Sequence, residues 1–116
     1  MILSDFFVLN HMKKIEAVIQ AVREQDVVNA LTELKIGGFT VLHGKGRGKS
    51  PKLEYGDPFT NILTVFTVVE DSKADQVVSA VSKAAHMGTT GDGKIFVSPV
   101  SEVTDISTNK KGERYL

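Results

Sequence analysis

Apolar side chains recur along the chain with two different periods, and these periods predict two helices set among strands. Two segments repeat apolar residues at three- and four-residue spacing, which is typical of one face of an α-helix. Other segments are rich in β-branched and aromatic residues, which is typical of strands. The predicted helices cover 26–34 and a segment that opens at Ser72 and ends between His86 and Gly88. The predicted strands cover 13–20, 39–42, 61–69 and 94–100, with a short fifth strand at 103–106.

Local signals set the expected ends of both helices. Gly37 and Gly38 follow the first helix, and glycine tolerates the left-handed backbone of a helix end, so we expect this pair to stop it. Ser72 is followed three residues later by Asp75, which resembles a capping box. We therefore expect the second helix to begin at Ser72.

The order of the main elements is strand, helix, strand, strand, helix, strand. This order predicts an α+β ferredoxin-like βαββαβ sandwich, in which an antiparallel sheet carries two helices on one face. The strand at 61–69 is apolar on both of its faces, so the sheet face without helices should also be buried. We expect other copies of the chain to cover that face in a homo-oligomer.

Composition narrows the class of protein. The chain has 116 residues, of which 41% are hydrophobic and 24% charged, which indicates one small globular domain. Basic and acidic residues number 14 each, whereas a nucleic-acid binder usually carries a basic excess, so we expect no nucleic-acid partner. The chain contains no cysteine, which excludes a disulfide scaffold, a thiolate metal site and a cysteine nucleophile. No apolar run approaches the roughly 20 residues that span a bilayer, so we do not expect a membrane protein.

The two ends differ from the domain between them. Residues 1–11 form an N-terminal extension with a short apolar cluster but without the basic start of a signal peptide, so we interpret the protein as cytoplasmic. The extension is either an interaction tail, which docks on a partner or a sister subunit, or a poorly ordered leader. The polar residues 109–116 predict a flexible tail, which leaves 12–108 as the folded domain.

Two loops combine glycine with basic residues. The Gly-Asp-Gly-Lys run at 91–94 could cradle a phosphate, because glycines let backbone N–H groups approach an anion, or it could be a plain Asp-Gly turn. The spacing at 88–94 also matches a Walker A loop, but Ile95 stands where a Ser or Thr must reach magnesium and a strand follows, so we reject a nucleoside triphosphatase. Residues 44–58 form a long loop whose start alternates glycine with Lys and Arg, either to wrap phosphates or as a solvated loop.

Catalytic and metal-binding patterns are missing from the sequence. His11, His43 and His86 lack the spacing of metal ligands, so we expect no metal site. No pair of carboxylates shares an apolar setting, and no Ser-His-Asp arrangement has local support. We therefore expect a protein that is not an enzyme.

The stretch from residue 12 to about 108 resembles the PII family of nitrogen-regulatory signal-transduction proteins. The strongest match is Ser-Lys-Ala-Ala at 82–85, then Gly88, then Gly-Asp-Gly-Lys-Ile-Phe-Val at 91–97, which resembles the family's C-terminal signature. Met87 departs from the Thr or Ser that is usual there. The Gly-x-Gly at 46–48 resembles the start of the family's long T-loop, and Phe-Thr-Val at 39–41 resembles the strand whose Thr contacts adenine.

The resemblance implies a homotrimer that binds an adenine nucleotide (ADP, AMP or ATP) in clefts between subunits, without a prosthetic group. It implies a T-loop, here 44–58, that controls a target protein such as a membrane transporter or a metabolic enzyme. Many members of the family also sense 2-oxoglutarate. Carried over by position, the nucleotide-binding residues are Thr40, Gly46, Gly48, Lys49, Val68, Gly91, Asp92, Gly93 and Lys94.

Several positions depart from the family pattern. Ser50 and Ile62 stand where the family has a Gln and a Lys that serve 2-oxoglutarate, and Asp105 and Ser107 stand where two Arg hold phosphates. The T-loop is shorter than usual, and Tyr55 does not align securely with the family's modified Tyr. Because charge-assisted contacts are the strong ones, we expect weak 2-oxoglutarate binding and no preference for the triphosphate. One alternative is a PII-like sensor of ADP, AMP or a cyclic nucleotide linked to bicarbonate or other ion transport. Another is a small trimeric metal- or ion-binding protein on the same scaffold.

Overall fold

The structure is a computed structural model that describes residues 11–48 and 59–116. Several predicted features lie outside these residues: the first ten positions of the N-terminal extension, the middle of the long loop, and with it Lys49, Ser50 and Tyr55.

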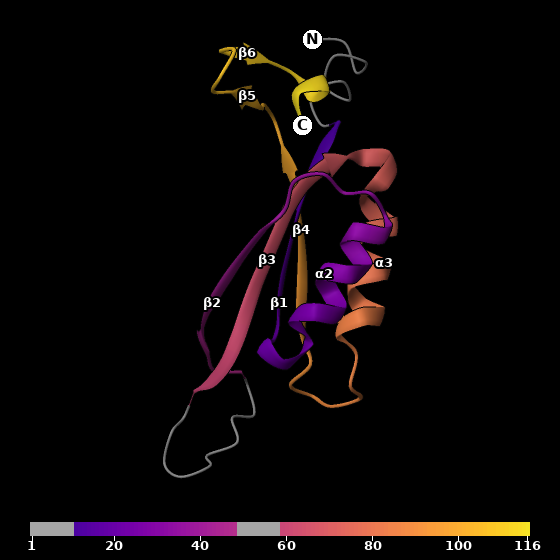
Figure 1. Ribbon diagram of the computed structural model, residues 1–116, viewed down its shortest axis with the longest axis vertical. Coiled ribbons are helices and arrows are strands. Elements are labelled where there is room, and N and C mark those ends of the chain that lie inside the picture. Colours follow the sequence, from indigo (N-terminus) through magenta and orange to yellow (C-terminus); the bar gives the residue numbers. More distant parts are fainter. Residues whose placement is uncertain (1–10, 49–58) are drawn as a thin grey trace.

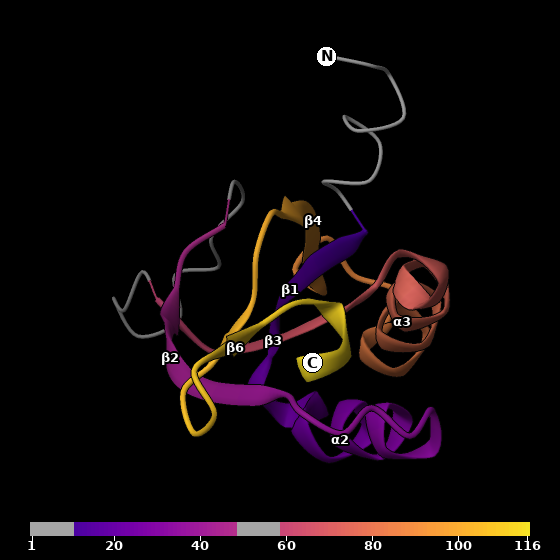
Figure 2. The same cartoon turned by 90° about the horizontal axis from the view of Figure 1, so that it is seen from above.

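The chain forms one four-stranded sheet with two helices on one side. Its elements are β1 (Met12–Gln20), the 3₁₀ helix η1 (Ala21–Arg23), α2 (Glu24–Glu33), β2 (Thr40–Gly46), β3 (Thr60–Glu70), α3 (Asp71–Ala85), β4 (Gly93–Val100), β5 (Thr104–Asp105), β6 (Lys110–Lys111) and the 3₁₀ helix η2 (Glu113–Tyr115). The strand order is β2-β3-β1-β4, and each neighbouring pair is antiparallel. Figures 1 and 2 show α2 and α3 together on one face of this sheet. The predicted ferredoxin-like fold is confirmed.

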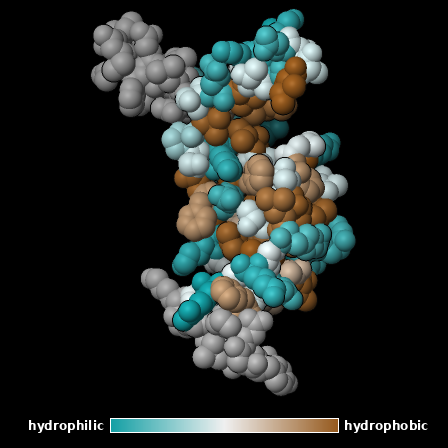
Figure 3. Space-filling view, turned by 90° about the vertical axis from the view of Figure 1, so that its left-hand side faces the viewer, coloured by the Kyte–Doolittle hydropathy of each residue, from teal (hydrophilic) through white to brown (hydrophobic). Residues whose placement is uncertain are grey.

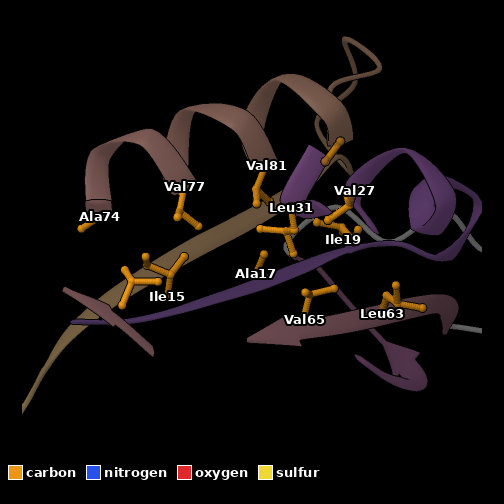
Figure 4. Close-up of a cluster of buried hydrophobic side chains, with 12 residues drawn as sticks. Ile15, Ala17, Ile19, Val27, Leu31, Leu63, Val65, Ala74, Val77 and Val81 are labelled. Atoms are coloured by element: carbon orange, nitrogen blue, oxygen red, sulfur yellow. The ribbon is translucent and has the colours of Figure 1, made fainter. Parts of the chain in front are cut away.

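The core lies between the sheet and the helices, where the two periods of the sequence meet. From Ile15 in β1 and from Leu63 in β3, every second residue is buried, which is the alternation of a strand that packs one face. α2 and α3 contribute side chains one helical turn apart, and Figure 4 shows them directed at the sheet. The largest fully buried side chains are Ile15, Val27, Leu31, Leu63, Val77 and Val81. Each such side chain stabilises the fold by about 1.5–3 kcal/mol relative to exposure.

The end of α2 differs from the prediction. The left-handed residue is Lys35, with φ 60°, and neither Gly37 nor Gly38 has a positive φ. The N–H groups of Lys35 and Ile36 donate to the carbonyls of Thr32 and Leu31 at 3.0 and 3.1 Å, which is the Schellman arrangement. The two backbone hydrogen bonds stabilise this helix end, so a lysine occupies the position where we expected glycine.

The predicted capping box at the start of α3 does not form. The helix begins at Asp71, one residue earlier, and its N-cap residue Glu70 makes no side-chain hydrogen bond. Instead, the N–H of Asp71 donates to the carbonyl of His11 at 2.7 Å. The chain just before β1 therefore satisfies this helix end, and local sequence spacing gives no sign of that contact.

An arginine on η1 covers the other end of α3. The Nη2 and Nε atoms of Arg23 donate to the carbonyl of Ala84 at 2.8 and 3.1 Å, and its Nη1 lies 3.1 Å from Asp26. A cation at a helix C-terminus meets both the orphan carbonyls and the negative end of the helix dipole. Arg23 thereby fixes the point from which the chain leaves α3.

The strands at the base of the long loop extend further than predicted. β2 continues through Gly46, and the register pairs Gly44 with Ile62, Lys45 with Asn61 and Gly46 with Thr60. We call residues 44–46 and 60–62 the stem. The prediction that the loop begins at residue 44 is therefore wrong, because pairing with β3 keeps glycine-rich residues in a strand.

The C-terminal residues contain structure that the sequence did not predict. β5 falls within the predicted fifth strand, but it pairs with β6 in a separate two-stranded sheet, and η2 follows. This hairpin stands at the end of the sheet where β4 finishes (Figure 1). Regular elements thus extend past residue 108 into the segment predicted as a tail.

The sheet face opposite the helices carries apolar side chains that the chain itself leaves accessible. Leu42 and Phe96 are each 54% exposed on this face, while Phe66 and Val68 are partly buried there. Figure 3, viewed from the side away from the helices, shows apolar patches between polar ones. Patches of this kind mark contact surfaces in many proteins, in agreement with the expected homo-oligomer.

Candidate functional site

The predicted site residues lie in three places: those for the base on β2 and β3, those for the phosphates at the start of β4, and two glycines at the start of the long loop. Thr40 opens β2 opposite Phe66, and Val68 lies on β3 opposite Lys14, so both lie on the face without helices. Gly91 and Asp92 precede β4, while Gly93 and Lys94 open it. Gly46 ends β2 in the stem, Gly48 follows two residues later, and Lys49 lies outside the described residues.

A single chain does not bring the residues predicted for the base and those predicted for the phosphates together. One row of the register runs from Leu42 on β2 through Thr64 and Val18 to Lys94 on β4. Neighbouring strands lie about 4.8 Å apart, so the ends of this row are about 14 Å apart. The stem and the start of β4 do share one end of the sheet, the lower end in Figure 1. A ligand that contacts both groups therefore needs either this span or a second copy of the chain.

The loop before β4, residues 86–93, which we call the glycine loop, is organised by Asp92. Its Oδ2 accepts from the N–H groups of Met87 and Gly88 at 2.8 and 2.9 Å, and its Oδ1 accepts from the N–H and hydroxyl of Thr89 at 3.3 and 2.8 Å. These bonds, that from Met87 first, lower the pKa of Asp92 to about 2. His86 Nδ1 lies 3.6 Å from the same carboxylate. These hydrogen bonds within the loop are enough to explain why an aspartate stands at this position. The contact of Asp92 with a phosphate stays a prediction.

Gly93 is glycine because of the neighbouring strand. Its φ is +128°, and a Cβ at this position would lie 2.0 Å from the carbonyl oxygen of Val18 and 3.1 Å from the Cα of Ile19. No L side chain fits against that fixed backbone. The close approach of β1 therefore requires this glycine, whichever ligand the loop binds.

Lys94 is the cation that follows the glycine loop. It lies at the start of β4 opposite Val18, on the face without helices, and its side chain is exposed. Among the residues the structure describes it makes no ion pair, so its charge is available to an anion. This is the position that the sequence predicted for a phosphate contact.

Gln20 is a residue of the site that the sequence did not reveal. As the last residue of β1, it donates from Nε2 to the carbonyl of Gly91 at 2.5 Å, across 71 positions of the chain. It also lines an open hollow of about 630 Å³ beside the stem. The other lining residues are Ala21, Val22, Lys45, Phe59, Thr60 and Asn61. A polar residue at a strand end was the only available signal, and it is too common to single out Gln20.

Ile62 and Asp105, two positions that depart from the family pattern, have defined neighbours in the structure. Ile62 lies against the glycines of the stem, where a Cβ on Gly46 would be 3.2 Å from it. Asp105 accepts from the hydroxyls of Ser107 and Thr108 at 2.7 and 2.8 Å and from the Thr108 N–H at 3.0 Å. These contacts, Ser107 first, hold the pKa of Asp105 below its usual range. Asp105 thus ends β5 and holds the turn of the C-terminal hairpin, at the end of the sheet away from the glycine loop (Figure 1).

Two further features are absent from the residues that the structure describes. Within 11–48 and 59–116, no three acidic or histidine side chains are grouped to hold a metal ion. No helix in these same ranges has the length and apolar character to cross a membrane.

Comparison with known proteins identifies the family of the chain. The family model described as "Nitrogen regulatory protein P-II" matches residues 12–110. A nitrogen regulatory protein P-II of Azospirillum brasilense is 42% identical over 108 residues, which cover 87% of this chain and 96% of the relative. A nitrogen fixation nifHD region GlnB-like protein 1 of Methanothermococcus thermolithotrophicus is 35% identical, covering 87% of this chain and 99% of the relative.

A solved structure agrees with these sequence matches. Arabidopsis thaliana PII bound to citrate superposes with a TM-score of 0.80 at 32% identity, covering 97% of this chain and 99% of that chain. The family model, the identities and the shared fold lead to one conclusion: the chain belongs to the nitrogen regulatory P-II family of signal-transduction proteins.

Proposed function

We propose that this protein is a regulator without enzymatic activity of its own, which binds an adenine nucleotide and controls a target protein through its T-loop. The observation that carries the proposal is the glycine loop with the exposed Lys94 beside it, at the end of the sheet where the T-loop begins; within 11–48 and 59–116 Lys94 has no ion-pair partner. Ordering of a loop by a ligand is a common switch in signalling proteins. The target, such as a transporter or a metabolic enzyme, and the cytoplasmic location remain parts of the proposal.

A homotrimer is the second part of the proposal. Two observations support it. In one chain, β2 and β4, the strands that carry Thr40 and Lys94, are separated by about 14 Å across the sheet, and the face without helices exposes the apolar side chains of Leu42 and Phe96. Adjacent copies that pack by this face would bring the two groups to one cleft. Light scattering at micromolar concentration should give three times the mass of the chain, and a monomer mass would contradict the proposal.

The nucleotide site can be tested with single lysine variants. Lys94→Ala should weaken ADP binding by about 10- to 150-fold, because one charge-assisted contact contributes about 1.5–3 kcal/mol. Lys49→Ala should weaken ADP binding by less, because the pairing of β1 with β4 holds the backbone of Lys94 in place for the contact. Lys73→Ala, on the exposed side of α3, is the matched control in calorimetric titrations. Equal losses for Lys94→Ala and Lys49→Ala would refute the assignment.

The runner-up function is a sensor of ADP, AMP or a cyclic nucleotide linked to bicarbonate or other ion transport. One observation favours it: Ile62 packs on the stem glycines and offers no charge or donor where the family uses a lysine for 2-oxoglutarate. We expect near-parity among ATP, ADP and AMP, and no micromolar 2-oxoglutarate binding with Mg-ATP. Titrations of each nucleotide with and without 2-oxoglutarate, and then with bicarbonate, separate the two functions. The citrate-bound Arabidopsis relative supports the view that this scaffold accommodates small anions.

A further inference from the structure

Gln20 connects two parts of the molecule that lie far apart in the sequence. Its side-chain amide donates to the Gly91 carbonyl of the glycine loop at 2.5 Å. Its backbone is paired in register with Ile62 of the stem, and its side chain lines the hollow that Thr60 and Asn61 also line. One residue therefore contacts the glycine loop and borders the stem.

The acceptor of this hydrogen bond belongs to a peptide unit that can change direction. The Gly91 carbonyl shares that unit with the N–H of Asp92, which donates to the Thr89 carbonyl at 3.3 Å, a long hydrogen bond. An anion that accepts a hydrogen bond from the Asp92 N–H draws this group away from the Thr89 carbonyl. The whole peptide unit between Gly91 and Asp92 then turns. Because glycine at position 91 has wide backbone freedom, this turn costs little there. The same turn removes the acceptor from Gln20.

We propose that Gln20 is a positioning residue that couples the glycine loop to the stem of the T-loop. Without an anion, Gly91 holds the Gln20 amide; with an anion bound, the amide is released toward the hollow beside Thr60 and Asn61. Ile62, the register partner of Gln20, packs against Gly44 and Gly46, so both strands of the stem are in contact with this region. The inference rests on the proposed function, because it requires an anionic ligand at the glycine loop.

The strength of one hydrogen bond limits this coupling. A neutral hydrogen bond contributes a factor of about 2–12 to an equilibrium, so Gln20 can change the linkage between loop and stem by no more than that. The linkage is reciprocal: a change in the stem alters nucleotide affinity by the same factor as the nucleotide alters the stem.

Hydrogen exchange of the stem tests the proposal. The probe is ADP at saturation, and the readout is amide exchange in peptides that cover 40–48 and 59–66, for the full chain. Gln20→Met keeps the length of the side chain and removes the donor, and Gln20→Glu offers the Gly91 carbonyl only an acceptor. Gln25→Met is the matched control, since Gln25 donates only to Asn29 on the exposed side of α2.

We expect ADP to change stem exchange by about 2- to 12-fold in the wild type and in Gln25→Met, and to leave it unchanged in both Gln20 variants. Calorimetry on the same variants should still show ADP binding, which separates lost coupling from a lost site. An equal change of stem exchange in Gln20→Met and in the wild type would overturn the role of Gln20 while leaving the nucleotide site intact. Failure of the wild type to bind ADP would instead reject the proposed function and the coupling with it.

Discussion

Among the glycines that the structure describes, Gly93 has the closest neighbours, so its replacement by alanine should be severely destabilising. The added Cβ would lie 2.0 Å from the Val18 carbonyl oxygen, far inside van der Waals contact, and the atoms it meets are backbone rather than the end of a flexible side chain. Relief requires β1 and β4 to separate where Gly93 pairs with Ile19. The perturbation therefore combines a strained φ of +128° with a backbone clash.

Each contribution has a known scale. A non-glycine residue at a positive φ costs about 1–3 kcal/mol, and overpacking a well-packed site costs about 1–3 kcal/mol more. Gly93→Ala should therefore lower the free energy of unfolding by about 2–6 kcal/mol. A domain of this size has about 6–17 kcal/mol in total, so the variant would lose a large share of its stability.

Two other glycines separate strain from clash. Gly88 has a φ of +85°, but a Cβ there would meet only the His86 ring at 3.9 Å, so Gly88→Ala should cost about 1–3 kcal/mol from strain alone. Gly37 has neither a positive φ nor a neighbour within 4 Å, so Gly37→Ala should be neutral or stabilise by up to about 1 kcal/mol. Equilibrium urea unfolding, followed by circular dichroism at one fixed protein concentration, measures all three. The reasoning fails if Gly93→Ala is no more destabilising than Gly88→Ala.

Two further predictions concern groups that hold the glycine loop and its helix. The pKa of Asp92 is lowered to about 2 from an ordinary value near 3.8, so its contribution to stability is complete above about pH 4 and is lost as the pH falls toward 2. Asp92→Asn should flatten the pH dependence of urea unfolding in that window, with Asp75→Asn as the control; an unchanged slope would contradict the role of the carboxylate. Arg23→Ala should lower the free energy of unfolding by about 1–3 kcal/mol, because it removes both donors to the Ala84 carbonyl. Arg23→Lys, which keeps the charge but not the paired donors, should lower the free energy of unfolding by less than Arg23→Ala. Equal losses would show that the paired donors, and not the charge, hold this helix end.

Local patterns were sufficient to predict the order of elements and the fold. The alternation in β1 and β3 and the helical spacing in α2 and α3 each depend on neighbours within a few residues, and both are visible in the sequence. The glycine loop was also found this way, because Gly, Asp and Lys at 91–94 are adjacent in the chain. These features follow from the sequence because the backbone geometry of a strand or helix repeats over short distances.

The remaining features depend on contacts between distant parts of the chain. Gly93 is required by the Val18 carbonyl 75 positions earlier, and Gln20 holds Gly91 across 71 positions. β2 extends through Gly46 only because β3 pairs with it, and α2 ends at Lys35 because two backbone hydrogen bonds stabilise a conformation usually left to glycine. Periodicity carries no information about which residues meet in space, since that is set by how the strands pair and the helices pack. The sequence therefore determined which segments form the main strands and helices, and the tertiary structure decided where they end and which of their residues lie together at the candidate site.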